Sequence, residues 1–172
     1  MPCPPEVLKL INQFSYYRSK YTAADYNETH LRNEFLNPLF EALGWDVYNK
    51  AGISELYKDV IHEDQVKIGG VTKAPDYSFR IGGTRKFFVE AKKPFIKIKE
   101  DPAPALQIRR YGWSAKLPIS VLTDFEEFAI YDCTIKPTEK DDVKKARIFY
   151  CQFTEYEEKW EWISERFSKN GI

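Results

Sequence analysis

Residues 74–93 read APDYSFRIGGTRKFFVEAKK, and this stretch predicts a β-hairpin that carries a charged site. Two β-prone runs flank the glycine pair at 82–83, an arrangement typical of a tight hairpin turn. Successive side chains of a strand alternate between its faces, so Glu90 and Lys92 project to the same side. Their neighbours are Phe, Val and Ala, which indicates a buried strand. Because buried charges need partners, this acid and lysine predict either an ion pair or an ion-binding site.

The rest of the chain alternates between helical and strand-like segments. Apolar residues recur at helical spacing at about 5–19, 27–43, 105–116 and 153–169. Short β-rich runs lie at 57–68, 75–81, 85–91, 117–123, 127–133 and 146–152. Pro38 lacks a main-chain N–H, so it should kink or divide the second helix. This order predicts an α/β domain in which helices flank a central mixed β-sheet.

The composition is that of one folded domain over residues 1–172. Of the 172 residues 43% are hydrophobic and 30% charged, which lies outside the range of disordered chains. The three cysteines show no CxxC spacing, and His30 and His62 have no partners at zinc spacing, so neither a disulfide scaffold nor a structural zinc site is expected. No signal peptide or membrane-length apolar run is present, which favours a cytoplasmic protein without a membrane partner.

The charges are balanced overall but unevenly distributed. Residues 80–116 contain ten Lys or Arg and three acids, whereas residues 124–168 contain seven basic and twelve acidic side chains. A basic middle followed by an acidic end would give the fold one positive side, which binding to a phosphate backbone requires. An ordinary solvated surface is the alternative interpretation.

Asp76 and Glu90 could bring two carboxylates together across the hairpin. Hard oxygen ligands suit Mg²⁺ or Mn²⁺, and Mg²⁺ commonly takes one or two carboxylates together with a substrate phosphate. Lys92, on the same face as Glu90, could then orient a water or stabilise a phosphorane. Two structural alternatives remain at this point: Asp76 as a turn residue after Pro75, and Glu90 with Lys92 as an ion pair.

The motif formed by Pro75-Asp76 and Glu90-Ala91-Lys92 resembles the signature of the PD-(D/E)xK nuclease superfamily. The segment from Gln107 to Tyr111 resembles the QxxxY element of its RecB-like branch. Residues 28–47 resemble the opening helix of the nuclease domains in type I restriction motor subunits and type IIG restriction enzymes. The likeness extends over nearly all of residues 5–168.

This resemblance implies a restriction-endonuclease-like core and a Mg²⁺-dependent endonuclease that hydrolyses phosphodiester bonds in double-stranded DNA. In that family pattern Asp76 and Glu90 would bind the metal and Lys92 would be the catalytic lysine. Glu34 would be a further, metal-supporting glutamate from the first core helix, with Glu28 as the alternative.

The resemblance also implies roles on the helix after the hairpin. Gln107 and Tyr111 would shape the site or contact DNA, although a capping glutamine and a core tyrosine are the structural alternatives. Arg109 and Arg110 beside the site, with Lys93 after the strand, are candidate phosphate contacts. Solvated helix charges are the alternative for the two arginines.

The expected context is a larger restriction-modification protein. The chain would be its N-terminal cleavage module, with downstream methyltransferase or helicase and specificity domains or subunits as partners. Two alternatives remain open: a standalone repair or resolvase-like nuclease, and a DNA-binding module that keeps the nuclease fold without turnover.

Overall fold

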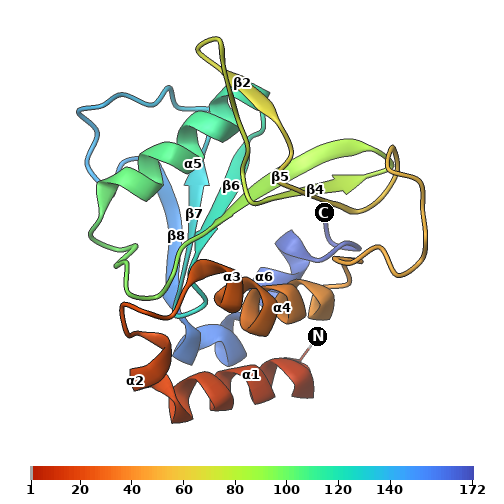
Figure 1. Ribbon diagram of the computed structural model, residues 1–172, viewed down its shortest axis with the longest axis vertical. Coiled ribbons are helices and arrows are strands. Elements are labelled where there is room, and N and C mark those ends of the chain that lie inside the picture. The colour runs from red at the N-terminus through yellow and green to blue at the C-terminus, as the bar shows by residue number, and fades with distance from the viewer. Residues whose placement is uncertain (1) are drawn as a thin grey trace.

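Six strands form a mixed β-sheet at the centre of the structure, a computed structural model that describes residues 2–172 (Figure 1). Across the sheet the order is β1 (Val60–His62), β4 (Tyr77–Ile81), β5 (Thr84–Ala91), β6 (Ile119–Thr123), β7 (Glu127–Asp132) and β8 (Arg147–Gln152). Strands β5 and β6 are parallel, and the other neighbouring pairs are antiparallel. The sheet is therefore mixed, as predicted.

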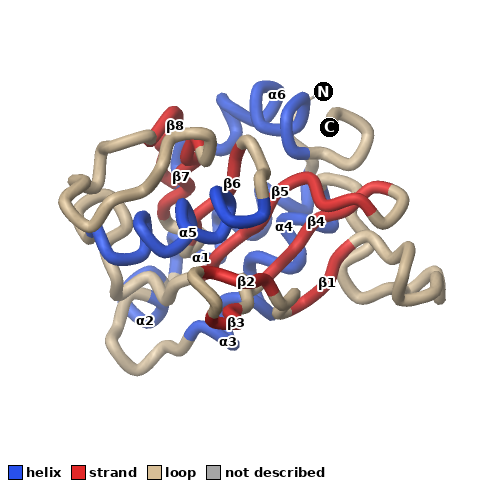
Figure 2. Tube along the Cα trace, turned by 90° about the horizontal axis from the view of Figure 1, so that it is seen from above, coloured by secondary structure: helices blue, strands red, loops and turns tan. Residues whose placement is uncertain are grey.

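Helices cover both faces of this sheet (Figures 1 and 2). They are α1 (Pro5–Tyr16), α2 (Arg18–Tyr21), α3 (Glu28–Leu31), α4 (Asn37–Ala42), α5 (Pro102–Ala115) and α6 (Tyr156–Phe167). Helix α5 crosses from β5 to β6 on one face, while α1, α4 and α6 enclose the larger hydrophobic core on the other. The predicted α/β architecture with flanking helices is confirmed.

The predicted hairpin is formed by β4 and β5. Gly82 and Gly83 join the strands with positive φ angles of 58° and 86°, which glycine adopts without a steric penalty. Phe79 and Phe87 lie opposite each other in the register, and their rings stack with centroids 4.7 Å apart. This pair anchors the hairpin in the larger core, and each such buried side chain contributes about 1.5–3 kcal/mol.

Alternation along β5 decides which way the charged residues point. Phe87, Val89 and Ala91 belong to the larger core, whereas Phe88 belongs to the smaller core beneath α5. Glu90 has the same parity as Phe88 and therefore faces α5. The charged end of the hairpin thus lies on the side of the sheet that α5 covers.

The second predicted helix is continuous but irregular. Between α3 and α4 the chain makes a π-helical turn at Arg32–Leu36, in which the Asn37 N–H bonds to the carbonyl of Arg32. Pro38 follows directly, and its missing N–H removes a regular helical hydrogen bond at this place. Pro38 was predicted to kink or divide the helix; the helix is not divided, and its irregularity takes the form of a π-turn directly before the proline.

The single strand predicted at 57–68 is wrong. The chain instead forms β1, a turn with Glu63 at φ 55°, and then β2 (Val66–Ile68). Strand β2 pairs with β3 (Val71–Lys73) across the turn Gly69–Gly70, and the two form a hairpin separate from the main sheet. The acids Glu63 and Asp64 interrupt the alternation that one long strand would need.

Helix α5 packs closely on the sheet that it crosses. Asp101 caps its first turn by accepting a hydrogen bond from the Ala103 N–H at 3.1 Å. Near its other end, a Cβ at Gly112 would clash with Cys133 and crowd Ser120, so only glycine permits this approach. This end of the helix is thereby held against the start of β6 and the end of β7.

Within residues 2–172, no helix combines the length and the apolar character needed to cross a membrane.

Candidate active site

Asp76 and Glu90 face each other where β4 begins and β5 ends. The pairing of Tyr77 with Val89 puts the two acids on adjacent strands. Glu90 Oε1 accepts a hydrogen bond from the Asp76 N–H at 3.0 Å, and Asp76 Oδ2 accepts one from the Ala91 N–H at 2.8 Å. Each carboxylate is therefore fixed by the backbone of the opposite strand. The interpretation of Asp76 as a simple turn residue does not account for this reciprocal pair.

Lys92 follows directly after β5 and remains half-buried. Its N–H donates to the carbonyl of Thr123 on β6 at 3.1 Å, so the backbone stays extended beyond the last strand residue. Its positive charge opposes the rise in the pKa of Glu90 and Glu28, which burial and Asp76 cause. Among the described residues, however, Lys92 forms no salt bridge, so the structural ion-pair interpretation is not supported.

Helix α3 brings Glu28 to the hairpin carboxylates. Burial and then the nearby charge of Asp76 raise the pKa of the half-buried Glu28 carboxyl group. The predicted residue, Glu34, is not brought to the site: it is exposed, and its Oε1 accepts a hydrogen bond from Tyr26 Oη at 2.9 Å. The choice of Glu34 is therefore corrected to Glu28.

Arg32, one turn after Glu28, was not predicted. Its guanidinium lies 3.5 Å from Asp76 Oδ1 and donates to the main-chain carbonyl of Asp76 at 3.3 Å. It also lies over the ring of Tyr77, 4.7 Å from the centroid. The spacing of four residues from Glu28 on one helix was the signal that could have identified Arg32.

Both glutamates at the site bind protons more tightly than ordinary glutamates. Burial, followed by the negative charge of Asp76, raises the pKa of Glu90 well above that of an ordinary glutamate. The same two causes raise the pKa of Glu28, while Lys92 and Arg32 act in the opposite direction. A cation bound beside Asp76 would therefore favour the ionised form of both glutamates.

Gln107 and Tyr111 on α5 form one unit beside the acids. Gln107 Nε2 donates to Tyr111 Oη at 3.0 Å. Burial raises the pKa of Tyr111, and the charges of Glu90 and Asp76 raise it further, which places the phenol near both carboxylates. The structure therefore brings Gln107 and Tyr111 to the predicted acids.

The predicted phosphate contacts divide into two kinds. Arg109 is wrong as a DNA contact, because its side chain is 1% exposed and its Nη1 pairs with Asp141 at 2.8 Å. Its helical spacing from Ala105 and Gly112 on the buried face of α5 could have shown this. Arg110 is 41% exposed, with only a long 3.8 Å contact to Glu139, and so remains available.

Lys93 lies beside the loop that precedes α3. Its Nζ donates to the carbonyl of Ala24 at 3.0 Å, and it lies 5.6 Å from the centroid of the exposed ring of Phe95. Its role as a phosphate contact stays a prediction.

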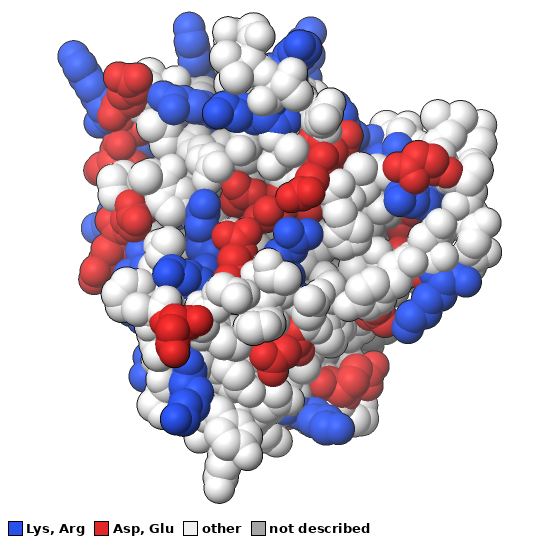
Figure 3. Space-filling model, viewed as in Figure 1, with Lys and Arg blue, Asp and Glu red and all other residues white. Residues whose placement is uncertain are grey.

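One face of the molecule presents this site. Figure 3, in the same view as Figure 1, shows acidic side chains gathered in the middle of the face. A row of Lys and Arg side chains follows the edge above them, where Figure 1 shows α5 and the β2–β3 hairpin. Basic side chains at the rim suit the binding of an anionic polymer, and the acids at the centre suit the binding of a cation.

The donor set fits a divalent cation that keeps part of its water shell. In residues 2–172, no group of three or more His, Cys, Asp or Glu side chains is arranged so that it could hold a metal ion. Mg²⁺ commonly binds through one or two carboxylates plus substrate phosphates, and the adjacent carboxylates of Asp76 and Glu90 supply such a pair. A cation there would also compensate the crowded negative charge, so these residues fit Mg²⁺ or Mn²⁺.

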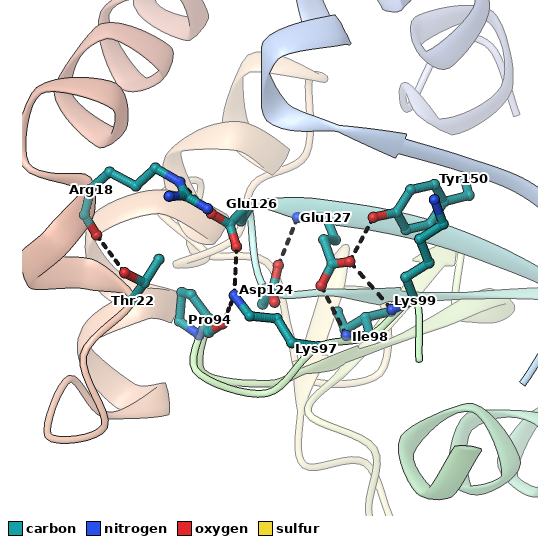
Figure 4. Close-up of polar contacts among 10 residues, drawn as sticks. All are labelled: Arg18, Thr22, Pro94, Lys97, Ile98, Lys99, Asp124, Glu126, Glu127 and Tyr150. Atoms are coloured by element: carbon teal, nitrogen blue, oxygen red, sulfur yellow. Dashed lines mark hydrogen bonds and ion pairs between the residues drawn. The ribbon is translucent and has the colours of Figure 1, made fainter. Parts of the chain in front are cut away.

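A second group of buried acids lies in the turn between β6 and β7, and Figure 4 shows its contacts. This turn group consists of Asp124, Glu126 and Glu127, each 5% exposed or less. Glu126 pairs with Arg18 at 2.7 Å and with Lys97 at 3.3 Å. Both of its carboxylate oxygens are therefore occupied by cationic side chains.

Glu127 is bound equally fully. Its carboxylate accepts hydrogen bonds from the Ile98 N–H at 2.8 Å, the Lys99 N–H at 3.3 Å and Tyr150 Oη at 2.6 Å (Figure 4). Asp124 Oδ1 accepts from the Glu127 N–H at 2.7 Å. Burial, and then the charge of Glu127, raises the pKa of Asp124. The turn group ties the segment after β5 to the sheet and has a structural role.

Comparison with known proteins finds similarity to restriction enzymes. The family model of the type I restriction enzyme R protein N terminus (HSDR_N) matches residues 25–139. The chain is 44% identical over 169 residues to RM.Eco57I, a type II restriction enzyme and methyltransferase of Escherichia coli. That alignment covers 97% of this chain and 17% of the relative, so the chain spans only a small part of that protein.

Two solved structures are similar to this one. The DrdV–DNA complex, determined by cryo-EM, matches with a TM-score of 0.50 and 11% identity, over 95% of this chain and 94% of that chain. The type IIG restriction endonuclease BpuSI matches with a TM-score of 0.41 and 20% identity, over 67% of this chain and 13% of that chain. The similarity to the DrdV chain shows a shared fold over almost the whole length.

Proposed function

The chain belongs to the type I restriction enzyme R protein N-terminal family (HSDR_N) of PD-(D/E)xK nucleases, and we propose that it is a Mg²⁺-dependent DNA endonuclease domain. The observation that carries this proposal is the convergence of Asp76, Glu90 and Lys92 at the end of one hairpin. The substrate would be the phosphodiester bond of double-stranded DNA. The product would be a strand cut by addition of water.

Asp76 and Glu90 would hold the cation, with Glu28 supporting Asp76 from α3. When bound, the ion would neutralise charge on the scissile phosphate and lower the pKa of a coordinated water. Arg32 holds Asp76 from the side of α3, and the backbone bonds across the hairpin fix both carboxylates. The protein thus presents its oxygen ligands in an arrangement that needs little rearrangement.

Lys92 would act on the reacting water and phosphate. Its ammonium has no salt bridge within the described residues, so its N–H donors are available. It can donate to the attacking oxygen or to a phosphate oxygen on which negative charge increases as the new P–O bond forms. Gln107 and Tyr111 would border this space from α5 and position the DNA strand.

We infer the partners of this chain from RM.Eco57I, of which the chain covers only 17%. RM.Eco57I combines restriction and methyltransferase functions in one protein. The chain would accordingly serve as the cleavage module of a restriction-modification enzyme, joined to methyltransferase and specificity parts. Duplex DNA would be its substrate, and sequence choice would come from those other parts.

The proposal is tested by nicking of supercoiled plasmid with Mg²⁺ or Mn²⁺ and with EDTA as the control. We expect metal-dependent cleavage that Asp76→Ala, Glu90→Ala and Lys92→Ala each abolish while circular dichroism and thermal unfolding stay those of the folded protein. Wild-type cleavage by the Asp76→Ala protein would overturn the proposal. Glu34→Ala is the matched control, because this acid lies on the same helix as Glu28 but outside the site.

A further inference from the structure

The β2–β3 hairpin has no role in the nuclease proposal, yet it stands beside the site. We propose that this hairpin enters the major groove of duplex DNA next to the phosphodiester bond that is cut. The inference rests on the proposed function and names a contact surface that the site residues do not include.

The shape of the hairpin suits insertion into a groove. It forms a two-stranded sheet of its own, and Figure 1 shows it rising at the top of the molecule beside α5. Its tip is Gly69–Gly70, with φ angles of 57° and 82°, and a Cβ at either glycine would meet nothing within 4 Å. The tip therefore extends into open space. A two-stranded ribbon fits the major groove of B-DNA, which is about 12 Å wide.

The charge of the hairpin suits a phosphate backbone. Residues 65–73 read QVKIGGVTK, with two lysines and no acid. Lys67 and Lys73 are both exposed. Lys67 also lines a cavity of about 620 Å³ together with Lys116 and the exposed ring of Trp113 at the end of α5. The hairpin and the end of α5 thus form one basic surface along the rim of the acidic site.

The outer strand presents groups that can reach base edges. All three residues of β3 are exposed, and Val71 is 54% exposed although it is apolar and β-branched. In the major groove, apolar side chains contact the thymine methyl group and hydroxyl groups contact base edges. Val71 and Thr72 supply one group of each kind. The exposure of Val71 has no explanation in the packing of the chain itself.

Both ends of the β2–β3 hairpin are attached to elements of the site, so the hairpin is held in a fixed position relative to the site. Val66 is 6% exposed and packs with Ile108 of α5, the helix that also carries Gln107 and Tyr111. At its other end, Lys73 precedes Asp76 by three residues, so the two are at most about 10 Å apart along the chain. A duplex whose phosphate lies at Asp76 must therefore pass beside the hairpin.

The first test measures binding of a fluorescent duplex of about three helical turns by anisotropy in EDTA, so that no cleavage occurs. We expect Lys67→Ala/Lys73→Ala to weaken binding about tenfold and to reduce the slope of log K against log salt by roughly two, since each lysine neutralises about one phosphate. Unchanged affinity and slope would overturn the proposal. Both lysines are exposed, so thermal unfolding should stay that of the wild type.

The matched control is Lys9→Ala/Lys20→Ala, which removes two exposed lysines from α1 and α2. Figure 1 shows both helices at the opposite end of the molecule from the hairpin. We expect wild-type affinity and salt slope from this variant. An equal loss in both double variants would show a general charge effect and overturn the proposal.

The second test identifies the groove with dimethyl sulfate, which methylates guanine N7 in the major groove and adenine N3 in the minor groove. We expect the wild type to protect guanine N7 and the variant Val71→Ala/Thr72→Ala to lose part of that protection. Protection of adenine N3 alone would overturn the assignment of the groove. Pairing of β3 with a strand of a second copy, seen as a dimer in sedimentation that Val71→Ala abolishes, would also overturn it.

Failure of this inference differs from failure of the proposed function. If Lys67→Ala/Lys73→Ala binds and cleaves as the wild type does while Asp76→Ala does not cleave, the hairpin proposal alone is wrong. If Asp76→Ala cleaves plasmid as the wild type does, the nuclease proposal is wrong, whatever the hairpin variants show.

Discussion

Two groups of buried acids lie at the ends of neighbouring strands and differ in what surrounds them. In the site group, Glu28, Asp76 and Glu90, burial and the charge of Asp76 raise the pKa of both glutamates, although Asp76 also contacts Arg32 and the two hairpin acids each accept a main-chain N–H. The turn group has cationic side chains, main-chain N–H groups and a tyrosine hydroxyl around Glu126 and Glu127.

Burial of acids is therefore not by itself a mark of a metal site. A carboxylate whose oxygens are filled by protein donors stabilises the fold, because those donors would otherwise remain unpaired. A carboxylate that lies close to other carboxylates can bind a metal cation, because the cation offsets their mutual repulsion. The donors around Glu126 and Glu127 distinguish these two acids from the site group, whereas Asp124, whose Oδ2 has no partner among the described residues, is crowded by Glu127.

The largest expected effect comes from removing an acid of the site group. Glu90→Gln should reduce DNA cleavage by about a thousandfold, because one ligand of the cation and the charge that orients Lys92 are both lost. The same change should leave the midpoint of thermal unfolding unchanged or higher, since it relieves the repulsion from Asp76. Cleavage is followed by plasmid nicking and unfolding by circular dichroism. If Glu90→Gln were less stable than the wild type but still cleaved DNA, the distinction between the site group and the turn group would be wrong.

In the turn group we expect the opposite: removing an acid should lower stability and leave DNA cleavage intact. Glu127→Ala should lower the free energy of unfolding by about 2–4 kcal/mol, because it leaves the buried N–H of Ile98 and the N–H of Lys99 without an acceptor. Below its unfolding midpoint the variant should still cleave DNA. Urea denaturation measures the change, and Glu100→Ala, an exposed acid of the same segment, is the control. Full stability of Glu127→Ala would contradict the structural role.

Stability should also depend on pH through the site group. The raised pKa of Glu90 and Glu28 means that the folded protein binds protons that the unfolded chain releases. Their contribution to stability is fully present below the ordinary glutamate pKa of 4.5 and is lost as pH rises through the raised values.

Mg²⁺ should therefore raise the unfolding midpoint more at mildly alkaline than at mildly acidic pH, because the cation replaces those protons. Thermal unfolding of the metal-free and Mg²⁺-loaded protein at several pH values measures this. Glu90→Gln should flatten the pH dependence by at most about 1.4 kcal/mol per pH unit. A stabilisation by Mg²⁺ that is independent of pH would contradict competition between cation and proton at these acids.

The smallest expected effect separates two glutamates of one helix. Glu28→Gln should reduce cleavage about tenfold, in line with the loss of a group that supports a metal ligand, whereas Glu34→Gln should have no effect. Single-turnover cleavage at saturating Mg²⁺ measures both. Equal losses would mean that the helix matters for reasons other than the contact between Glu28 and Asp76.

Much of the site could be predicted from local spacing. Glu90 and Lys92 are two residues apart in a strand, and a glycine turn returns the chain to Asp76, so alternation and hairpin pairing suffice to bring them together. Gln107 and Tyr111 are one helical turn apart, and their hydrogen bond follows from that spacing. These residues owe their arrangement to elements close together in the chain.

Other assignments depended on contacts that spacing does not encode. Arg109 is buried because Asp141, far along the chain, supplies its partner. Glu28 rather than Glu34 lies beside Asp76 because the helix makes a π-turn between the two glutamates and packs against β4 through Arg32 and Phe40. The β2–β3 hairpin was hidden in a predicted single strand because a turn at Glu63 separates it from β1.

The sequence by itself determined the hairpin, its three charged residues and the α/β order, because periodicity and turn chemistry are local properties. Only the tertiary structure decided which acids are crowded and which are satisfied. A carboxylate acquires its role from the donors and charges around it, and packing brings these from distant parts of the chain.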